Sequence, residues 1–313
     1  MNAIKWEGIY SALLTPFDEK DNIDFKFFEI NINAQVESGI DGIVLGGSLG
    51  EASTLTHDEK RSLLMSAKSI VKNKIPVILN IAEQSTQEAI RVAQNAEKNG
   101  ADGLMVLPPM RYFADKNETL EYFKNIAART SLPIMIYNNP HDYKIEVTLD
   151  MFEQLAEIPS VQAIKESTRD VSNVTRIKNK FRNRFKILCG VDTLAFEELT
   201  MGADGWVGGL VDAFPYETVA VYRLIKAGEH QQALKIFRWF LPLLELDIHP
   251  KFAQYIKLAA TRTGLGTEYV RAPRLALAGT EREKILLTIN NAIEKRHEIL
   301  NYLEYASAKE KAS

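Results

Sequence analysis

The sequence predicts an α/β fold in which eight parallel strands alternate with helices and close into a barrel, followed by a helical extension. Three observations support this prediction. Short apolar, β-branched runs recur along the chain, longer amphipathic segments fill the gaps between them, and the alternation stops after Gly228. We therefore expect a (β/α)8 TIM barrel over residues 1–228 and a C-terminal helical extension over residues 229–313.

Eight apolar runs are the strand candidates of this barrel. Most of them are continuously apolar, as is typical of parallel strands that are buried on both faces. They are GIYSALLTPF, DGIVLGG, PVILNIA, DGLMVLPP, PIMIYNNP, VQAIKES, FKILCG and DGWVGGL. An open doubly wound sheet more often carries a glycine-rich dinucleotide loop after its first strand, and GIYSALLTPFDEK contains none. The pattern therefore favours a closed barrel.

The helices between the strands are indicated by the residues at their ends. Thr56 with Glu59, and Ser85 with Glu88, have the spacing of a capping box. Single N-cap candidates are Asp24, Asp115, Thr148 and Asp192, and glycines 39, 100, 202 and 228 fall where a left-handed residue ends a helix. Beyond Gly228 the pattern is wholly helical, in HQQALKIFRWFLPLLEL, HPKFAQYIKLAATRTG and EREKILLTINNAIEKRHEILNYLEYA.

The composition excludes several classes of protein. A net charge of -3 offers no sequence-wide attraction for nucleic acid or anionic lipid. The N-terminal MNAIKWEGIY has no apolar core of signal-peptide length, and no apolar run approaches the ~20 residues that span a bilayer, so we expect a cytoplasmic protein. A single cysteine, Cys189, excludes an internal disulfide, and the five histidines form no HxH or HExxH, so we expect no catalytic metal.

Lys165 stands near the end of the sixth predicted strand, in VQAIKES. An ammonium group costs several kcal/mol to desolvate without a partner, so a lysine in a buried strand requires an explanation. Such a lysine commonly snorkels to the surface or pairs with a neighbour, here Glu166, although a barrel interior makes snorkelling harder. The alternative is a nucleophilic amine that forms a Schiff base with a carbonyl. Bringing a lysine pKa from 10.4 to near 7 requires ~4–5 kcal/mol of destabilisation of the charged form, which an apolar interior can supply.

Two further segments end predicted strands with polar groups. Tyr137, in IMIYNNP, is either a core aromatic bonded to a backbone carbonyl or a phenol that passes protons to and from a carbinolamine oxygen. GGSLGE, Gly46–Glu51, is either a tight turn or a loop whose N–H groups and Ser48 hydroxyl hold a substrate carboxylate. We expect Cys189, at the end of the seventh predicted strand, to pack in the core rather than to act as a nucleophile.

Four motifs occur together in a specific order: GGSLGE after the second predicted strand, YNNP after the fifth, IKES on the sixth and CGVD after the seventh. Through them the chain resembles the dihydrodipicolinate synthase / N-acetylneuraminate lyase family, from GIYSALLTPF to YVRAPR. The resemblance implies a class I enzyme on a (β/α)8 barrel, usually tetrameric, with no cofactor. It also implies a Schiff base between a lysine and the ketone of pyruvate or a related 2-oxo acid.

Carried over by position, the resemblance implies that Lys165 is the Schiff-base lysine and Tyr137 the proton shuttle. Ser48 would bind the carboxylate and relay protons with Tyr137. Leu49 replaces a second hydroxyl residue common in the family, but it keeps its backbone N–H. The implied substrate-binding set is Gly47, Ser48, Leu49 and the carbonyl of Val207.

Two departures from the family pattern concern the second substrate. The dihydrodipicolinate synthases usually carry a tyrosine after the fourth strand that completes the relay from a neighbouring subunit, and Met110 falls at that place; Tyr112 could substitute only if the loop is rearranged. They also place an arginine, which holds the carboxylate of aspartate semialdehyde, where this chain has Asp142. An anion beside an anionic group should cost at least ~2 kcal/mol in a desolvated site.

These observations lead to a functional hypothesis with open alternatives. We expect a Schiff-base lyase acting on a small 2-oxo acid or its cyclic imine, of the dehydratase or deaminase type, such as a 1-pyrroline-4-hydroxy-2-carboxylate deaminase. The alternatives are a pyruvate-dependent aldolase or a 4-hydroxy-tetrahydrodipicolinate synthase, a metal-dependent lyase, and a catalytically silent barrel that binds a 2-oxo acid. The expected partners are the small-molecule substrate and other copies of the chain in a dimer or tetramer, with no nucleic acid and no membrane.

Overall fold

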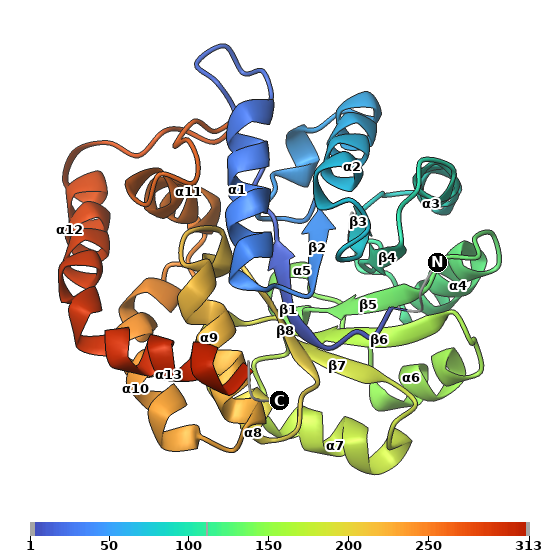
Figure 1. Cartoon of the computed structure of the whole chain (residues 1–313). Helices are drawn as coiled ribbons and strands as arrows, with labels where there is room; N and C mark the ends of the chain where they lie inside the picture. The colour runs from blue at the N-terminus through green and yellow to red at the C-terminus, as the bar shows by residue number, and fades with distance from the viewer. Residues whose placement is uncertain (1–3, 111, 311–313) are drawn as a thin grey trace.

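The computed structural model describes residues 4–110 and 112–310 and forms a closed parallel barrel with helices around it (Figure 1). Each strand is hydrogen-bonded to the next in chain order, and β8 closes the ring by pairing with β1. The predicted (β/α)8 fold class is confirmed. The strands are β1 (Gly8–Ala12), β2 (Gly42–Leu45), β3 (Val77–Ile81), β4 (Gly103–Val106), β5 (Ile134–Asn138), β6 (Val161–Glu166), β7 (Lys186–Cys189) and β8 (Gly205–Gly208).

Helices connect successive strands and cover the outside of the barrel. The α-helices up to the last strand are α1 (Phe25–Ser38), α2 (His57–Val71), α3 (Thr86–Lys98), α4 (Lys116–Ala127), α5 (Pro140–Tyr143), α6 (Leu149–Ala156), α7 (Ser172–Phe181) and α8 (Ala195–Thr200). Short 3-10 turns are η1 (Ala52–Thr54), η2 (Asp192–Leu194) and η3 (Leu210–Asp212). After β8 follow α9 (Pro215–Lys226), α10 (His230–Leu244), α11 (Phe252–Arg262), α12 (Gly279–Lys295), η4 (Arg296–Ile299) and α13 (Leu300–Glu310).

Each of the eight predicted apolar runs contains one strand, and the strands are shorter than the runs. The difference lies mostly at the carboxyl ends. There the chain leaves the sheet as soon as glycine, proline or polar residues begin, as in the Gly46–Gly47 and Asn139–Pro140 pairs. These ends form loops on one side of the barrel, which is where (β/α)8 enzymes place their chemistry.

Most of the predicted helix ends are also present. Thr56 and Glu59 form the full capping box at the start of α2. Ser85 accepts a hydrogen bond from the Glu88 N–H, but the Glu88 carboxylate binds Arg91 instead of reaching back. Gly39 ends α1 at a φ of 87°, a left-handed conformation that glycine adopts at little cost. The elements read from these ends therefore start and stop close to where we expected.

The C-terminal helices pack directly on the barrel's own last helix. In Figure 1, α9, α10 and α13 lie beside one another on one flank of the barrel. The aromatic rings of Phe214, Trp239 and Phe240 meet at centroid distances of 5.7–5.9 Å between α9 and α10. Because the packing is continuous across Gly228, the division into units 1–228 and 229–313 stays a prediction. The expected homo-oligomer also stays a prediction.

The barrel interior holds its own apolar cluster, separate from the core between strands and helices. Its members alternate along the strands with the side chains that face the helices, as the period of two requires. At the amino-terminal end of the barrel, Trp6 stacks on Tyr10 at 5.8 Å and donates to the Gln162 side chain at 3.0 Å. The polar residues of the interior lie at the opposite, carboxyl end.

A buried ion pair joins the loop after β2 to the C-terminal helices. The Glu51 carboxylate is fully buried and binds the ammonium group of Lys257 from α11, whose side chain is 1% exposed. Burial lowers the pKa of Lys257 to about 8, although the Glu51 charge opposes that shift. The Arg271 N–H donates to the same carboxylate at 3.2 Å, and the Arg274 guanidinium lies 3.6 Å from it. Glu51 itself adopts a left-handed φ of 55°.

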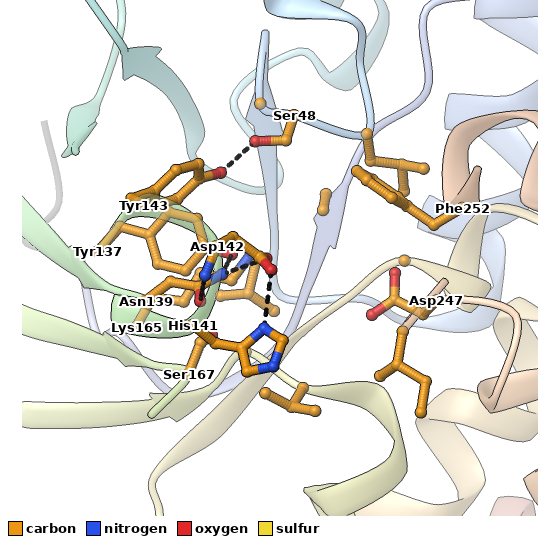
Figure 2. A pocket seen from close by; sticks show the side chains of 18 of the residues that line it. Ser48, Tyr137, Asn139, His141, Asp142, Tyr143, Lys165, Ser167, Asp247 and Phe252 are labelled. Carbon is orange, nitrogen blue, oxygen red and sulfur yellow. Dashed lines mark hydrogen bonds and ion pairs between the residues drawn. The ribbon is translucent and has the colours of Figure 1, made fainter. Parts of the chain in front are cut away.

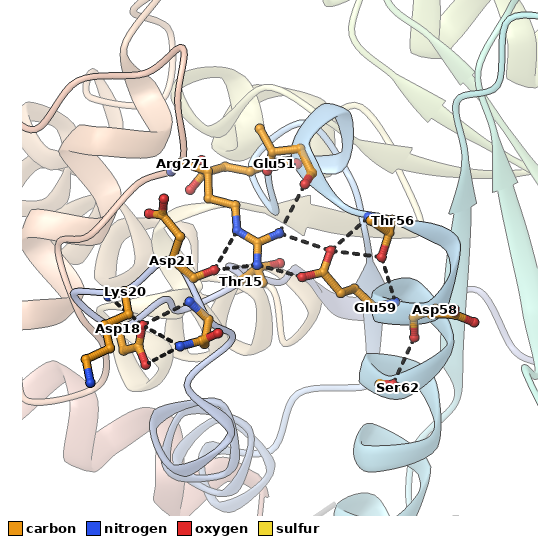
Figure 3. Close-up of polar contacts among 12 residues, drawn as sticks. Thr15, Asp18, Lys20, Asp21, Glu51, Thr56, Asp58, Glu59, Ser62 and Arg271 are labelled. Carbon is orange, nitrogen blue, oxygen red and sulfur yellow. Dashed lines mark hydrogen bonds and ion pairs between the residues drawn. The ribbon is translucent and has the colours of Figure 1, made fainter.

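Arg271 continues this connection toward α2 (Figure 3). Its guanidinium binds both oxygens of Glu59, at 3.0 and 2.6 Å, and lowers the pKa of that carboxyl to about 2. The same group donates to the carbonyls of Asp21 and Thr54. One arginine therefore fixes the β1 and β2 loops against the C-terminal extension.

In the part of the chain that the structure describes, no helix is both long and apolar enough to cross a membrane.

We predict that Lys257→Met lowers the free energy of unfolding by about 3 kcal/mol, because it leaves the Glu51 carboxylate buried without its main counter-charge. Urea unfolding followed by circular dichroism measures this change. Lys251→Met is the matched control, since its ion pair with Glu281 is about half exposed and should contribute less than about 1 kcal/mol. In the double variant Glu51→Gln/Lys257→Met part of the loss should be recovered; a loss equal to the sum of the single variants would contradict the coupling.

Candidate active site

A cavity of about 450 Å³ opens at the carboxyl end of the strands (Figure 2). The six residues to which the sequence analysis gives a catalytic or substrate-binding role all line this one cavity. They are Gly47, Ser48, Leu49, Tyr137, Lys165 and Val207. They come from the loop after β2, from β5, β6 and β8, so the closure of the barrel brings together segments that are up to 160 residues apart (47 to 207).

Lys165 is held inside the barrel with its amine beside an aromatic ring. Its side chain is 6% exposed, and its Nζ lies 4.3 Å from the centre of the Tyr137 ring. Tyr137 and Lys165 are register partners on β5 and β6. Gly190, after β7, makes room for the lysine, because a Cβ at that position would lie 2.7 Å from the Lys165 Cε. The stem of the lysine is therefore enclosed on several sides.

The two ordinary explanations for a strand lysine do not apply to Lys165. Its neighbour Glu166 points away from the interior, and its carboxylate binds the Thr168 N–H at 2.7 Å and the Asn173 amide at 2.9 Å. Among the described residues none forms an ion pair with the Lys165 amine, and the enclosed stem cannot snorkel. Burial lowers the pKa of Lys165, while the more distant acid Asp247 opposes that shift. An amine in this setting has a larger neutral, nucleophilic fraction than a free lysine.

Tyr137 places its hydroxyl at the same cavity. Its side chain is 7% exposed, and burial raises the pKa of Tyr137 to about 12, so the phenol is protonated at neutral pH. The Asn139 amide donates to the Tyr137 hydroxyl at 3.1 Å and to the Asp142 carboxylate at 2.8 Å. Asn139 therefore links the tyrosine to a carboxylate at the cavity wall. This link follows from the YNNP motif but was not part of the sequence analysis.

The GGSLGE loop presents backbone donors to the cavity. Among the described residues, the N–H groups of Ser48 and Leu49 have no protein acceptor, although the carbonyls of Gly47 and Ser48 are bonded within the turn. The loop is held from behind, because Thr15 donates to the Gly50 carbonyl at 2.8 Å and Glu51 forms the buried ion pair. Two adjacent N–H groups without a partner are suited to bind a carboxylate.

Tyr143 is the residue of this site that the sequence analysis missed. Asn139 caps the single turn α5 by accepting from the Asp142 N–H, and Lys144 ends the turn at a φ of 61°. The Tyr143 side chain projects from the end of the turn into the cavity, and its hydroxyl is hydrogen-bonded to the Ser48 hydroxyl (Figure 2). Its ring meets the Tyr137 ring edge to face at 5.6 Å. The sequence could have located Tyr143 at the site only if a helical turn beginning at Pro140 had been predicted.

The two residues considered for a relay after β4 lie elsewhere. Met110 is half-buried and packs against the apolar interior cluster. Tyr112 is 54% exposed, and neither residue lines the cavity of its own chain. A role of Tyr112 at the cavity of a neighbouring subunit stays a prediction.

The outer wall of the cavity carries charges of both signs. The Asp142 carboxylate is about half exposed, lies 3.2 Å from the His141 ring nitrogen and 4.0 Å from the Arg169 guanidinium. Asp247, from the segment after α10, faces the cavity from the opposite side (Figure 2). Burial raises the pKa of Asp247 well above its ordinary value, and the nearby Asp192 adds to this shift. The cavity is therefore flanked by two acids.

The CGVD segment after β7 stabilises the turn after β8 next to the cavity. Asp192 is buried and accepts from the Trp206 indole at 2.8 Å and the Leu210 N–H at 2.9 Å, which fixes the turn after β8. Cys189 is fully buried, and burial raises the pKa of its thiol, in keeping with packing. In residues 4–110 and 112–310, no three His, Cys, Asp or Glu side chains are grouped as a metal site would require.

Comparisons with known proteins agree with this geometry. A model of the dihydrodipicolinate synthetase family matches residues 5–292. The 4-hydroxy-tetrahydrodipicolinate synthase of Moorella thermoacetica is 30% identical over 282 residues, 90% of this chain and 97% of that protein. Synthase 1 of Halalkalibacterium halodurans is 29% identical over 90% of this chain and 96% of its own length. The solved 4-hydroxy-tetrahydrodipicolinate synthase of Methylacidiphilum fumariolicum SolV is similar at a TM-score of 0.88 and 30% identity, covering 96% and 99% of the two chains.

The barrel and these matches define an enzyme of the lyase or aldolase type. The chain belongs to the dihydrodipicolinate synthetase family.

We predict that Gly190→Ala reduces turnover at least about 100-fold while the fold is kept. The added carbon would lie 2.2 Å from the Ser167 hydroxyl oxygen, 2.7 Å from Lys165 Cε and 2.8 Å from Lys165 Cγ. Both side chains must therefore shift, and the amine leaves its position beside Tyr137. Steady-state kinetics and thermal unfolding measure the two effects separately. Gly266→Ala is the control and should retain activity, because its added carbon lies away from the site and would meet the Ala260 Cβ at 3.1 Å and the Ala260 carbonyl carbon at 3.9 Å. Full activity in Gly190→Ala would contradict this account of the lysine's position.

Proposed function

We propose that this protein is a class I aldolase-type enzyme in which Lys165 forms a Schiff base with the ketone of pyruvate or a related 2-oxo acid. The observation that carries the proposal is the enclosed amine of Lys165, which has no ion-pair partner among the described residues and lies 4.3 Å from the Tyr137 ring. Family membership supports the proposal, because the resemblance noted above implies this chemistry. Ser48, Leu49 and Tyr137 are suited to bind the substrate carboxylate and to transfer protons.

The proposed steps assign one task to each group. The substrate carboxylate binds the N–H groups of Ser48 and Leu49, which places the keto carbon next to the Lys165 amine. The amine attacks that carbon, and the Tyr137 hydroxyl donates a proton to the oxygen that leaves as water. The resulting iminium withdraws electrons from the neighbouring carbon, which loses a proton and becomes a nucleophilic enamine. The enamine adds to a carbonyl acceptor, or the same steps in reverse cleave a carbon–carbon bond.

The named relatives favour a condensing reaction as the outcome. Those reported above are called 4-hydroxy-tetrahydrodipicolinate synthases, and that condensation is therefore the first candidate for this chain. The dehydratase or deaminase type, including 1-pyrroline-4-hydroxy-2-carboxylate deaminase, gains no support from these names. It is kept as a second candidate because of Asp142, an acid at the place of the arginine that holds an anionic aldehyde.

We predict that pyruvate followed by borohydride leaves a stable mass adduct on Lys165, and that Lys165→Ala abolishes it. Because burial lowers the pKa of Lys165, the trapping rate should rise with pH and reach its plateau below the value of 10.5 of an ordinary lysine. Intact mass and peptide mapping over a pH series measure both effects. The absence of an adduct with pyruvate and every other 2-oxo acid tested would remove the Schiff-base mechanism and favour a silent barrel; activity lost to a strong chelator would favour a metal-dependent lyase.

We predict that Asp142→Asn raises kcat/KM for an acceptor aldehyde that carries a carboxylate by about fivefold, corresponding to about 1 kcal/mol between half-exposed like charges. The measurement is product formation from pyruvate with aspartate semialdehyde and with an uncharged aldehyde of similar size. Asp150→Asn, an exposed acid on α6, is the control. A lower rate with the anionic aldehyde in Asp142→Asn would show that Asp142 does not oppose the acceptor.

A further inference from the structure

A second acidic group besides Tyr137 would connect the proton steps of this site with bulk water. Forming the iminium removes the carbinolamine oxygen as water, and forming the enamine releases a proton from the adjacent carbon. A buried phenol that has given up its proton either takes the proton that the carbon releases or is reprotonated from solvent between the two steps. Reprotonation from solvent requires a group that is close to the reacting centre on one side and reaches bulk water on the other.

Tyr143 and Ser48 have the required arrangement. Their hydroxyls are hydrogen-bonded to each other, and either of the two oxygens can be the donor. Both residues line the cavity that contains Lys165, and Tyr143 is half-buried rather than enclosed. Burial raises the pKa of Tyr143, so its phenol also carries its proton at neutral pH. A proton can therefore pass between the two oxygens in either direction.

Tyr143 is held near Tyr137 by the short segment of the same chain that connects them. It is the last residue of the turn α5, which begins three residues after Tyr137 and is capped by Asn139. Asn139 is also bonded to the Tyr137 hydroxyl, so one amide positions both the turn and the first tyrosine. The two tyrosine rings then meet edge to face at 5.6 Å. Within a single copy of the chain this puts a second phenol at the site.

We propose that Tyr143 is the second tyrosine of the proton relay and that it acts through Ser48 within the same chain, so that no residue of a neighbouring subunit is needed. The inference rests on the proposed Schiff-base function. In the forward direction Tyr137 donates a proton to the carbinolamine oxygen, the carbon–oxygen bond breaks and water leaves. Ser48 returns a proton to Tyr137 and takes the Tyr143 proton as its own is lost, and water at the cavity mouth reprotonates Tyr143. In the next step a proton from the substrate carbon returns along the same path.

The first test compares Tyr143→Phe with the unchanged enzyme. The substitution removes one oxygen and keeps the ring that packs on Tyr137, so the fold and the cavity should be retained. We expect kcat to fall about 100-fold with little change in KM for pyruvate, and imine formation in single turnover to slow by a similar factor. The yield of the borohydride adduct at long times should stay the same. The solvent deuterium isotope effect on kcat should increase, because proton transfer becomes rate-limiting.

Tyr112→Phe is the matched control, because Tyr112 is 54% exposed and lies outside the cavity of its own chain; if no neighbouring subunit takes part, its kinetics should be unchanged. If the unchanged enzyme gives no adduct, the proposed function fails. If the adduct forms but Tyr143→Phe has the normal kcat, the relay inference alone is overturned. A rise in KM with normal kcat would likewise overturn it, since that pattern indicates substrate binding rather than proton transfer.

A second test asks which chain supplies the phenol. Lys165→Ala and Tyr143→Phe chains carrying different tags are co-expressed, and assemblies containing both are isolated. If Tyr143 acts within its own chain, these assemblies are no more active than Tyr143→Phe alone. Recovery of activity toward half that of the unchanged enzyme would mean that a neighbour supplies the tyrosine and would overturn the inference. A chain that stays monomeric and active supports the inference, because it has no neighbour.

Discussion

Desolvation of the Lys165 amine is the constraint on which the arrangement of the surrounding residues depends. The amine has to lose water without gaining a counter-ion, because a close carboxylate would hold it in the charged, unreactive form. The barrel meets both conditions. Glu166 is turned outward and bonded to Thr168 and Asn173, and the ring of Tyr137 and the backbone of Gly190 occupy the space next to the lysine. The acids Asp192 and Asp247 act only from a greater distance.

The loops around this lysine are held by groups that are far apart in sequence. The β2 loop, which carries Ser48 and Leu49, is connected to α11 through Glu51 and Lys257 and to the segment after α11 through Arg271. This buried pair gives the C-terminal extension a structural role in the site, since it fixes the loop whose backbone donors line the cavity. The extension also supplies Asp247 to the outer wall of the cavity. The barrel and the extension therefore build the site together.

Asn139 has a comparable function on the opposite wall. Its side chain bonds the Tyr137 hydroxyl and the Asp142 carboxylate, and it caps the turn that ends with Tyr143. A single amide thus connects the Tyr137 hydroxyl next to the lysine with the Asp142 carboxylate at the cavity wall. Moving the turn α5 would move both Asp142 and Tyr143.

The sequence by itself determined the architecture and the position of the buried lysine. Short continuous apolar runs bounded by glycine and proline favour buried strands, and the glycine and capping residues mark the helices between them, because these preferences are local. Lys165, Tyr137 and Ser48 could be found since each follows or ends such a run. Tyr143, Asn139 and the Glu51–Lys257 pair required the tertiary structure. Their roles depend on the direction of side chains in a short turn and on a contact across 206 residues, and neither leaves a periodic signal in the sequence.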